Sequence, residues 1–321
     1  MSRNSSDCTG LRTGSRGEAG LRASSDRGSR DRSGDGTDFA LVTIAIPTFN
    51  RAHYLPKAIE AALAQTHRNL EILISDNAST DKTPEICAHY AQNDPRIRYV
   101  RQPSNIGPTE NFRFVLENAS GEYFIWLGDD DWIDENYIEV CAETLLENPD
   151  VSIAVGVPWY YEGEVFRYTG TIINLPQASP VDRVKGYFSR VRHNSVLCGV
   201  MRTRQLRGVD MRDEYGGDVL MAAALAFTGK IVVLDTTTLH RRLGGHSSDI
   251  ERLVKNMSWS WMERYFPLTT AARNVFCSIT RWEKVYSSLP GWRRYILAIE
   301  CLFLALVRKL RAVGHRGQGR E

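Results

Sequence analysis

Three consecutive carboxylates, Asp129, Asp130 and Asp131, are the residues of this chain whose types and spacing most directly suggest chemistry. They follow the apolar run 123–127, which is typical of a strand buried on both faces, and Gly128 ends that run. Adjacent carboxylates repel one another and cannot enter a core unpaired, so they must face water or share a cation. The pattern predicts a cation site; the alternative is a turn whose acids cap a helix beginning near Asn136.

The elements around these acids alternate between strand and helix, which predicts an α/β fold. Apolar runs predict strands at 41–47, 70–76, 97–102 and 123–127, and helical spacing of apolar residues follows each of them, the last time at 136–147. Such alternation implies right-handed crossovers and a mostly parallel sheet. Ligands bind beyond the carboxyl ends of the strands in such sheets, where the three acids would lie.

After Pro149 the alternation weakens. We expect strands at 151–157, 166–173, 196–201 and 231–235, and a helix at 218–228 that Gly229 closes. A basic, Gly-rich loop is expected at 239–249, and mainly helix from about residue 250.

The composition is that of an ordinary globular protein. The 321 residues carry a net charge of +2, so there is no strong basic field of the kind that nucleic-acid binding needs. Six scattered cysteines without CxxC spacing favour reduced thiols in a cytosolic protein over disulfides or zinc. Residues 1–39, rich in Ser, Gly, Arg and Asp, are expected to be a disordered tail, and their lack of an apolar run argues against a secretory signal.

The expected last helix, at about 292–313, is basic and amphipathic and too short in its apolar run to cross a bilayer. Its charged residues fall on one side (Arg293, Glu300, Arg308, Arg311) and its apolar residues mainly on the other (Ile296, Ile299, Leu302, Phe303, Leu306, Leu310). Two interpretations stay open. The helix lies on an anionic membrane surface, or it packs on the domain with its arginines in water.

Neither of the common glycine-rich phosphate motifs, GxGxxG or GxxxxGK[ST], follows an early strand. The strands end instead in polar or acidic residues: Thr48 and Asn50, then Asp76, then the three acids. This arrangement suits a nucleotide whose pyrophosphate is neutralised by a divalent cation on one or two carboxylates. For Asp76, Ser79 and Asp81, helix capping is the alternative.

Four segments together resemble the inverting family-two glycosyltransferases of GT-A fold: IPTFNR (46–51), SDNASTDKT (75–83), NIGPTENF (105–112) and ASGEYFIWLGDDDW (119–132). The resemblance covers about 41–245. Within this family, the SDNAST and LGDDD segments are similar to those of bacterial O-antigen and surface-polysaccharide transferases of the abequosyltransferase-like group. It implies a Rossmann-like nucleotide-sugar domain at 40–249, followed by a helical region at 250–321.

The resemblance also implies roles for individual donor-site residues. A first group would border the nucleotide base and ribose: Pro47, Thr48, Asn50 and Arg51. Asp76 would accept the ring N–H of the base, and Asp129 would face the donor ribose or sugar. Asp130 matches the last Asp of the family's D-x-D element, which binds Mn²⁺ or Mg²⁺ on the sugar diphosphate. The first Asp of that element falls on Gly128, which leaves the duties of Asp129 and Asp131 open.

For the catalytic base, the resemblance points to Asp218, at the start of the helix 218–228. The family usually has Glu before this Asp, where this chain has Gly217, so Asp213 and Glu214 compete with Asp218 for the role. A plain helix cap is the structural alternative. Arg241, Arg242 and His246 lie in the segment that closes over the diphosphate in relatives, and His246 is also a candidate metal contact.

These inferences predict metal-assisted, inverting transfer of a hexose or deoxyhexose from a nucleotide-sugar to a hydroxyl of a glycan or lipid-linked glycan. The expected place is the cytoplasm, at the inner face of the plasma membrane. Because Gly128 and Gly217 replace acids, a non-catalytic nucleotide- or carbohydrate-binding protein is the alternative. A nucleotidyltransferase would need a Gly- and Lys-rich phosphate loop after the first strand, and IPTFNR is not one.

Overall fold

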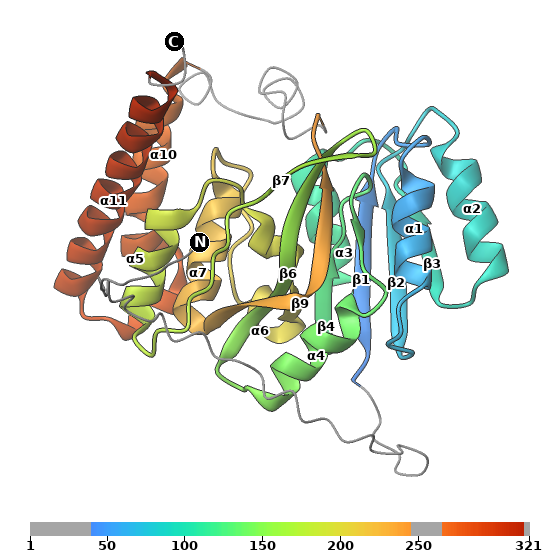
Figure 1. The fold of residues 1–321 in the computed structure, drawn as a ribbon, viewed down its shortest axis with the longest axis horizontal. Helices are drawn as coiled ribbons and strands as arrows, with labels where there is room; N and C mark the ends of the chain where they lie inside the picture. Colours follow the sequence, from blue (N-terminus) through green and yellow to red (C-terminus); the bar gives the residue numbers. More distant parts are fainter. Residues whose placement is uncertain (1–39, 245–264, 318–321) are drawn as a thin grey trace, which may run out of the picture. The chain divides into compact units, whose positions relative to one another are not determined.

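The computed structural model describes residues 40–244 and 265–317, with side chains described as far as Lys309 (Figure 1). The chain divides into two units, Met1–Asp38 and Phe39–Glu321, and the second is described below. The expected tail 1–39, His246, and the side chains of Leu310 and Arg311 lie outside the described residues.

A mixed, mostly parallel sheet forms the centre of the unit, as the sequence predicted. Its strand order is β3-β2-β1-β4-β8-β6-β9-β5, with β7 added on β6. The four strands of the first half are parallel: β1 (Val42–Thr48), β2 (Leu70–Asp76), β3 (Ile97–Arg101) and β4 (Tyr123–Trp126). The second half holds β5 (Trp132–Ile133), β6 (Val151–Glu162), β7 (Val165–Thr169), β8 (Val200–Arg202) and β9 (Lys230–Arg242). Here β6 and β9 are parallel, and β8 joins the two halves through antiparallel pairs.

Helices cover both faces of this sheet. Those of the first half are α1 (Leu55–Leu63), α2 (Thr83–Asn93), α3 (Pro108–Glu117) and α4 (Tyr137–Glu147). Those of the second half are α5 (Pro180–Arg190), α6 (Thr203–Arg207), α7 (Gly217–Thr228), α10 (Pro267–Cys277) and α11 (Gly291–Gly317). Short turns of 3₁₀ or π helix are η1 (Ser195–Cys198), η3 (Ser278–Trp282) and η4 (Lys284–Ser288). Proline stands in the first turn of α1, α2, α3, α5 and α10, where its missing N–H costs nothing.

The strands divide the apolar core into two layers because successive side chains point to opposite faces. Along β1 and β4, Ala45, Phe124 and Trp126 pack into a layer shared with α3, α5, α7 and the C-terminal helices. Their neighbours Ile44 and Ile125 pack into the opposite layer, with α1 and α4. This double burial explains why the early strands are apolar throughout rather than alternating.

The structure corrects the expected loop at 239–249 for its described part, 239–244, whereas 245–249 lie outside the described residues. β9 continues through Leu239–Arg242 and pairs with the end of β6, where Tyr160 lies beside Arg241 and Tyr161 beside Arg242. Trp132 and Ile133 of β5 add a second partner on the other side. The pairing satisfies the backbone of a segment that we read as a loop because of its charges. The expected strand at 196–201 is likewise the turn η1 followed by β8.

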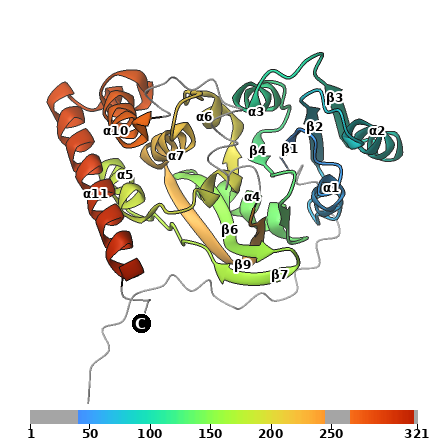
Figure 2. The ribbon, with the colours of Figure 1, turned by 90° about the horizontal axis from the view of Figure 1, so that it is seen from above.

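The C-terminal helices pack on the domain. In Figures 1 and 2, α10 and α11 lie beside α5 and α7, at the opposite end of the sheet from β2 and β3. The buried side of α11 holds Leu297, Ala298 and Cys301. Along the described part of the chain, no helix has the length and apolar composition needed to cross a bilayer.

A stripe of large apolar side chains on α11 remains exposed: Trp292, Tyr295, Ile296, Ile299, Phe303 and Leu306. The expected apolar face is therefore mostly outside the contact with the domain, and a neighbouring face makes that contact. The two interpretations of this helix do not exclude each other.

Candidate active site

The loops that follow β1 and β2 are tied together by hydrogen bonds. The backbone N–H of Asn50 donates to Ser79 Oγ at 2.8 Å, and Thr80 N–H donates to Asn50 Oδ1 at 2.8 Å. The backbone N–H of Arg51 donates to Thr83 Oγ1 at 2.9 Å. Asn50 adopts a left-handed backbone (φ 53°), a conformation that Asn accepts more readily than most residues. The two motifs IPTFNR and SDNASTDKT thus hold each other in place.

Asp76, at the end of β2, is fully buried. Its carboxylate accepts hydrogen bonds from Ser79 N–H at 2.9 Å and Tyr99 Oη at 3.2 Å, and it lies 3.6 Å from Arg101 Nε. Its neighbour Asn77 is the residue of this strand end that lines the cavity. In this conformation Asp76 shapes the turn, and a bond to a nucleotide base would require exchange of one of these partners.

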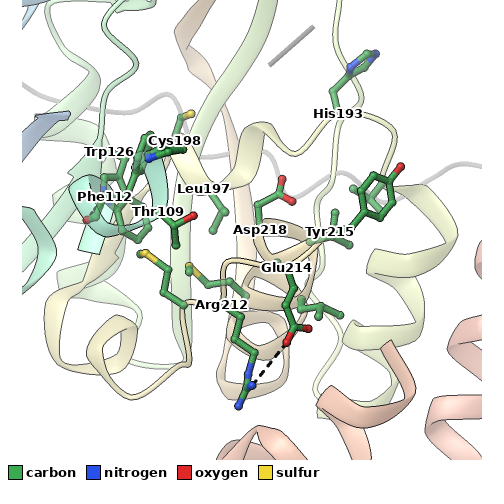
Figure 3. A pocket seen from close by; sticks show the side chains of 18 of the residues that line it. Thr109, Phe112, Trp126, His193, Leu197, Cys198, Arg212, Glu214, Tyr215 and Asp218 are labelled. Atoms are coloured by element: carbon green, nitrogen blue, oxygen red, sulfur yellow. Dashed lines mark hydrogen bonds and ion pairs between the residues drawn. The ribbon is translucent and has the colours of Figure 1, made fainter. Parts of the chain in front are cut away.

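One cavity of about 1690 Å³ lies beyond the carboxyl ends of the strands (Figure 3). At the side of the early strands it is lined by Pro47, Thr48, Arg51, Asp129, Asp130 and Asp131. Further along it is lined by Arg241, Glu214 and Asp218. Single-ligand pockets are typically ~300–1,000 Å³, so this cavity has room for two substrates. Of the expected donor-site residues, the structure brings five to this wall and leaves Asn50 and Asp76 behind it.

Asp129 and Asp130 are held together with a single guanidinium. Arg51 Nε lies 3.4 Å from Asp129 Oδ1, and Arg51 Nη2 lies 3.4 Å from Asp130 Oδ2. The two carboxylates are only 14% and 16% exposed. Burial, together with repulsion from Asp130, raises the pKa of Asp129 to about 7, and burial and Asp131 also raise the pKa of Asp130. The two carboxylates therefore share one positively charged partner, Arg51, which neutralises only part of their negative charge.

Asp131 has a different task. It is 2% exposed and accepts hydrogen bonds from Arg241 Nε at 3.0 Å and from the backbone N–H of Arg242 at 3.1 Å. It thereby anchors β9 beside the cavity. The arginine at 242 points elsewhere: its side chain donates to Gly163 O at 3.0 Å and pairs with Glu164 at 3.2 Å. A Cβ at Gly128 would lie 2.8 Å from Asp131 Oδ2, so this glycine leaves the space that the Asp131 carboxylate uses.

The family resemblance implies a divalent cation, and the residues present fit one. No cluster of three or more potential protein ligands occurs among the described residues. Two under-neutralised carboxylates on a cavity wall match the sites where one or two acids and the substrate's phosphates share Mg²⁺ or Mn²⁺. Asp130 and Asp129 would hold the ion, because Asp131 is occupied by the β9 arginines.

Asp218 lies in the first turn of α7, and its exposed carboxylate faces the cavity. It is not the helix cap. Gly216 is the N-cap residue (φ 82°), and no side chain caps the helix. Asn194 Nδ2 donates to Asp218 Oδ2 at 3.1 Å, and the fully buried Tyr187 donates its hydroxyl to Asn194 Oδ1 at 2.8 Å.

The glycine before Asp218 has a steric reason. A Cβ at Gly217 would lie 2.4 Å from the carbonyl oxygen of Arg212, so the Glu of the family pattern cannot occupy this backbone. The competing acids differ in position. Asp213 accepts a hydrogen bond from Thr109 Oγ1 at 2.9 Å and does not line the cavity, whereas Glu214 does line it, 3.9 Å from Arg212.

The segment 208–218 is held by the C-terminal region. Glu283 Oε2 accepts the backbone N–H of Asp210 at 3.3 Å, and Asn274 Nδ2 donates to Tyr215 O at 3.4 Å. Arg308 of α11 donates to the carbonyl oxygens of Phe188 and Val191, at the end of α5 and just before Asn194. The roles of Asn194 and of these C-terminal residues were not predicted from the sequence, because neither belongs to a recognisable motif.

Comparison with known proteins places the chain in a family. The model of the family "Glycosyl transferase family 2" matches residues 43–208. The chain is 35% identical over 115 residues to Glycosyltransferase GlyA of Streptococcus pneumoniae, which is 36% of this chain and 16% of GlyA. It is 27% identical over 217 residues to the hyaluronan synthase of Pasteurella multocida, which is 66% of this chain and 21% of the synthase. The chain thus spans only a minor part of these relatives.

Solved structures show the same fold at low identity. Staphylococcus aureus TarS 1–349 in complex with UDP-GlcNAc has a TM-score of 0.55 and 16% identity, over 87% of this chain and 93% of the TarS 1–349 chain. The mannosyltransferase PcManGT of Pyrobaculum calidifontis, in complex with GDP-Man and Mn²⁺, has a TM-score of 0.53 and 17% identity, over 89% and 82%. The fold is GT-A, and with the family match covering more than half of its length, the chain belongs to glycosyl transferase family 2.

Proposed function

We propose that this protein transfers a sugar from a nucleotide-sugar donor to a hydroxyl group of an acceptor. The observation that carries the proposal is the single cavity that joins the pair Asp129–Asp130 to Asp218. At one end, Asp129 and Asp130 share a single guanidinium and can therefore bind a metal ion that carries a diphosphate. At the other end, the exposed carboxylate of Asp218 is held in place by a hydrogen bond from Asn194. A transferase needs both in one space.

The proposed reaction is a direct displacement. The acceptor oxygen attacks the anomeric carbon while the bond from that carbon to the diphosphate oxygen breaks, and the nucleoside diphosphate leaves. Asp218 takes the acceptor's proton as general base, and Asn194 holds its carboxylate in place. Attack from the face opposite the leaving group inverts the configuration, as the family resemblance implies.

Donor binding is proposed for the other end of the cavity. Pro47, Thr48 and Arg51 would border the nucleotide, and Asp129 the donor sugar or ribose. A bound Mn²⁺ or Mg²⁺ would stabilise negative charge on the departing diphosphate. Arg241 lines the cavity beside these acids and would contact the phosphates, whereas Arg242 faces Glu164 and would have to turn to do so. The proposed contact of His246 with the diphosphate or the metal involves a residue outside the described ones.

The donor and the pathway rest on relatives and on the resemblance. TarS binds UDP-GlcNAc and PcManGT binds GDP-Man, which supports a nucleotide-sugar donor for this chain. We propose a hexosyl or deoxyhexosyl transfer in surface-polysaccharide or O-antigen assembly, as in the abequosyltransferase-like group. The acceptor would be a glycan or a lipid-linked glycan.

Membrane attachment through α11 belongs to the same proposal. The exposed stripe on this helix is apolar and carries Arg293 and Lys309 nearby, a combination suited to an anionic membrane surface. Phe303→Glu should release the protein from anionic vesicles in a flotation assay, because it places a charge in the apolar layer. The matched control is Leu146→Glu on α4, since Leu146 is similarly exposed (69% against 64% for Phe303) but belongs to a different helix. Equal partitioning of both variants with the wild type would refute the attachment.

The test of function is transfer by the purified chain. Incubation with nucleotide-sugars and Mn²⁺ should release a nucleoside diphosphate from one of them, and Asp218→Asn should lose at least ~10²-fold in rate while still binding that nucleotide. Glu214→Gln distinguishes the competing base: loss there with activity retained in Asp218→Asn would move the role to Glu214. Tight nucleotide binding without any turnover would favour the non-catalytic alternative.

A further inference from the structure

The cavity extends past Asp218 into an apolar limb formed by the C-terminal helices. Its walls there include Leu268, Ala272 and Val275 of α10 and Leu302, Ala305 and Leu306 of α11. None of these side chains offers a hydrogen bond to a sugar. A polar glycan alone gains nothing from such a surface, whereas an apolar chain gains about 0.8 kcal/mol for each CH₂ that it buries.

Small residues give this limb its width. Ala271 and Ala272 stand on one wall and Ala305 on the other. Leucine at these positions would fill the space with the protein's own side chains and join α10 to α11 more closely. The alanines leave an opening between two helices that contact each other elsewhere, for example through the rings of Phe276 and Tyr295.

Positive charges lie at the same end of the cavity. Arg192, Arg308 and Lys309 line it, and Arg192 and Lys309 are exposed. Arg308 already donates to two backbone carbonyls, so the other two cations are the ones available to a ligand. Basic side chains at the border of an apolar limb complement a molecule with an apolar chain and a phosphate.

The limb meets the exposed stripe of α11. Leu306 belongs to both: it lines the cavity and is 55% exposed. Leu268, also a wall residue, is 58% exposed. The apolar surface of the helix therefore continues into the interior, and Asp218 lies further along the same space (Figure 3).

We propose that this limb binds an acceptor in which a sugar is joined through phosphate to an apolar chain. The apolar chain would lie between α10 and α11, the phosphate would contact Arg192 and Lys309, and a hydroxyl of the sugar would reach Asp218. The inference rests on the proposed function and narrows its acceptor to one chemical class. It also makes the C-terminal helices part of the substrate site.

Farnesyl phosphate is a suitable probe for the apolar chain and the phosphate, added below its micellar concentration to the full chain and followed by titration calorimetry. We expect saturable binding that is at least 10-fold tighter than that of farnesol, with none measurable for inorganic phosphate. Ala305→Trp should weaken it at least 10-fold by filling the limb, and Lys309→Glu about 5-fold or more by reversing a charge. The control is Lys284→Ala, which removes an exposed cation of η4 that does not line the cavity and should bind as the wild type does.

Two outcomes would overturn the inference: no binding by the wild type, or equal binding by the wild type, Ala305→Trp and Lys309→Glu. A dimer that Leu306→Glu dissociates would also overturn it, because a second copy would then cover the limb. Lys309→Glu keeps the test valid if Ala305→Trp does not fold. Nucleoside diphosphate binding is measured on the same samples: its presence without lipid-phosphate binding rejects this inference alone, and its absence in the wild type rejects the proposed function.

Discussion

Asn194 donates a hydrogen bond from Nδ2 to Asp218 Oδ2 at 3.1 Å, and so fixes one oxygen of the candidate base. Asn194 is itself fixed by the hydroxyl of Tyr187. A base that is oriented in this way need not search for its acceptor during the reaction. Asn194 thus acts as a positioning residue for the proposed chemistry.

Asn194→Ala should lower kcat about 10-fold and leave the KM of the donor unchanged, because it frees the Asp218 carboxylate without touching the donor end. Tyr187→Phe should have a smaller effect in the same direction, since it removes only the hydroxyl that orients Asn194. Steady-state kinetics of both variants provide the check. An unchanged kcat in Asn194→Ala would show that this hydrogen bond does not serve the reaction.

Replacement by Asn should affect the free energy of unfolding differently at Asp131 and at its neighbour Asp130. Asp131→Asn leaves Arg241 without its buried partner and should lower the free energy of unfolding by about 2–4 kcal/mol. Asp130→Asn removes a charge that burial and Asp131 oppose, and should leave that free energy unchanged or raise it slightly. Urea denaturation in the absence of metal measures both. Equal destabilisation by the two variants would contradict the separate tasks assigned to them.

The stability of the folded protein should depend on pH through Glu283, the C-terminal residue that binds the backbone of the segment 208–218. Burial raises its pKa to about 7 in the folded protein, above its ordinary value near 4.5. Between these values the unfolded chain loses the proton while the folded chain keeps it, so stability falls as pH rises from about 4.5 to 7.

Glu283→Gln removes this titration. At pH 8 the variant should be more stable than the wild type, by up to about 3 kcal/mol, and the difference should disappear near pH 4. Denaturation curves at the two pH values test this. A Gln variant that is less stable than the wild type at pH 8 would mean that the ionised carboxylate supports the fold.

The sequence predicted the first half of the fold well for a physical reason. β1, β2 and β4 are buried on both faces, so their apolar runs are unmistakable, and each is followed by an amphipathic helix. The fold class, GT-A with a mostly parallel sheet, was confirmed. The end of β9 was predicted wrongly because the partners of its charged residues, on β6 and β5, are distant in the sequence.

The candidate site was predictable to the extent that its residues lie in motifs. Thr48, Arg51, Asp129, Asp130 and Asp218 all lie on the cavity wall. Sequence patterns alone did not reveal that Asp131 holds β9, that Gly217 fits against Arg212, or that α11 forms a wall. Each of these depends on contacts between segments far apart in the chain.

The most direct test of the central claim is calorimetric binding of uridine, guanosine, cytidine and thymidine diphosphates to the purified chain, with Mn²⁺ and again with a chelator. We predict that one of them binds tightly only when Mn²⁺ is present, and that Asp130→Asn loses this binding while Arg293→Ala keeps it. If the folded wild type bound none of the four, or bound one equally well with chelator, the site built on Asp129 and Asp130 would be contradicted.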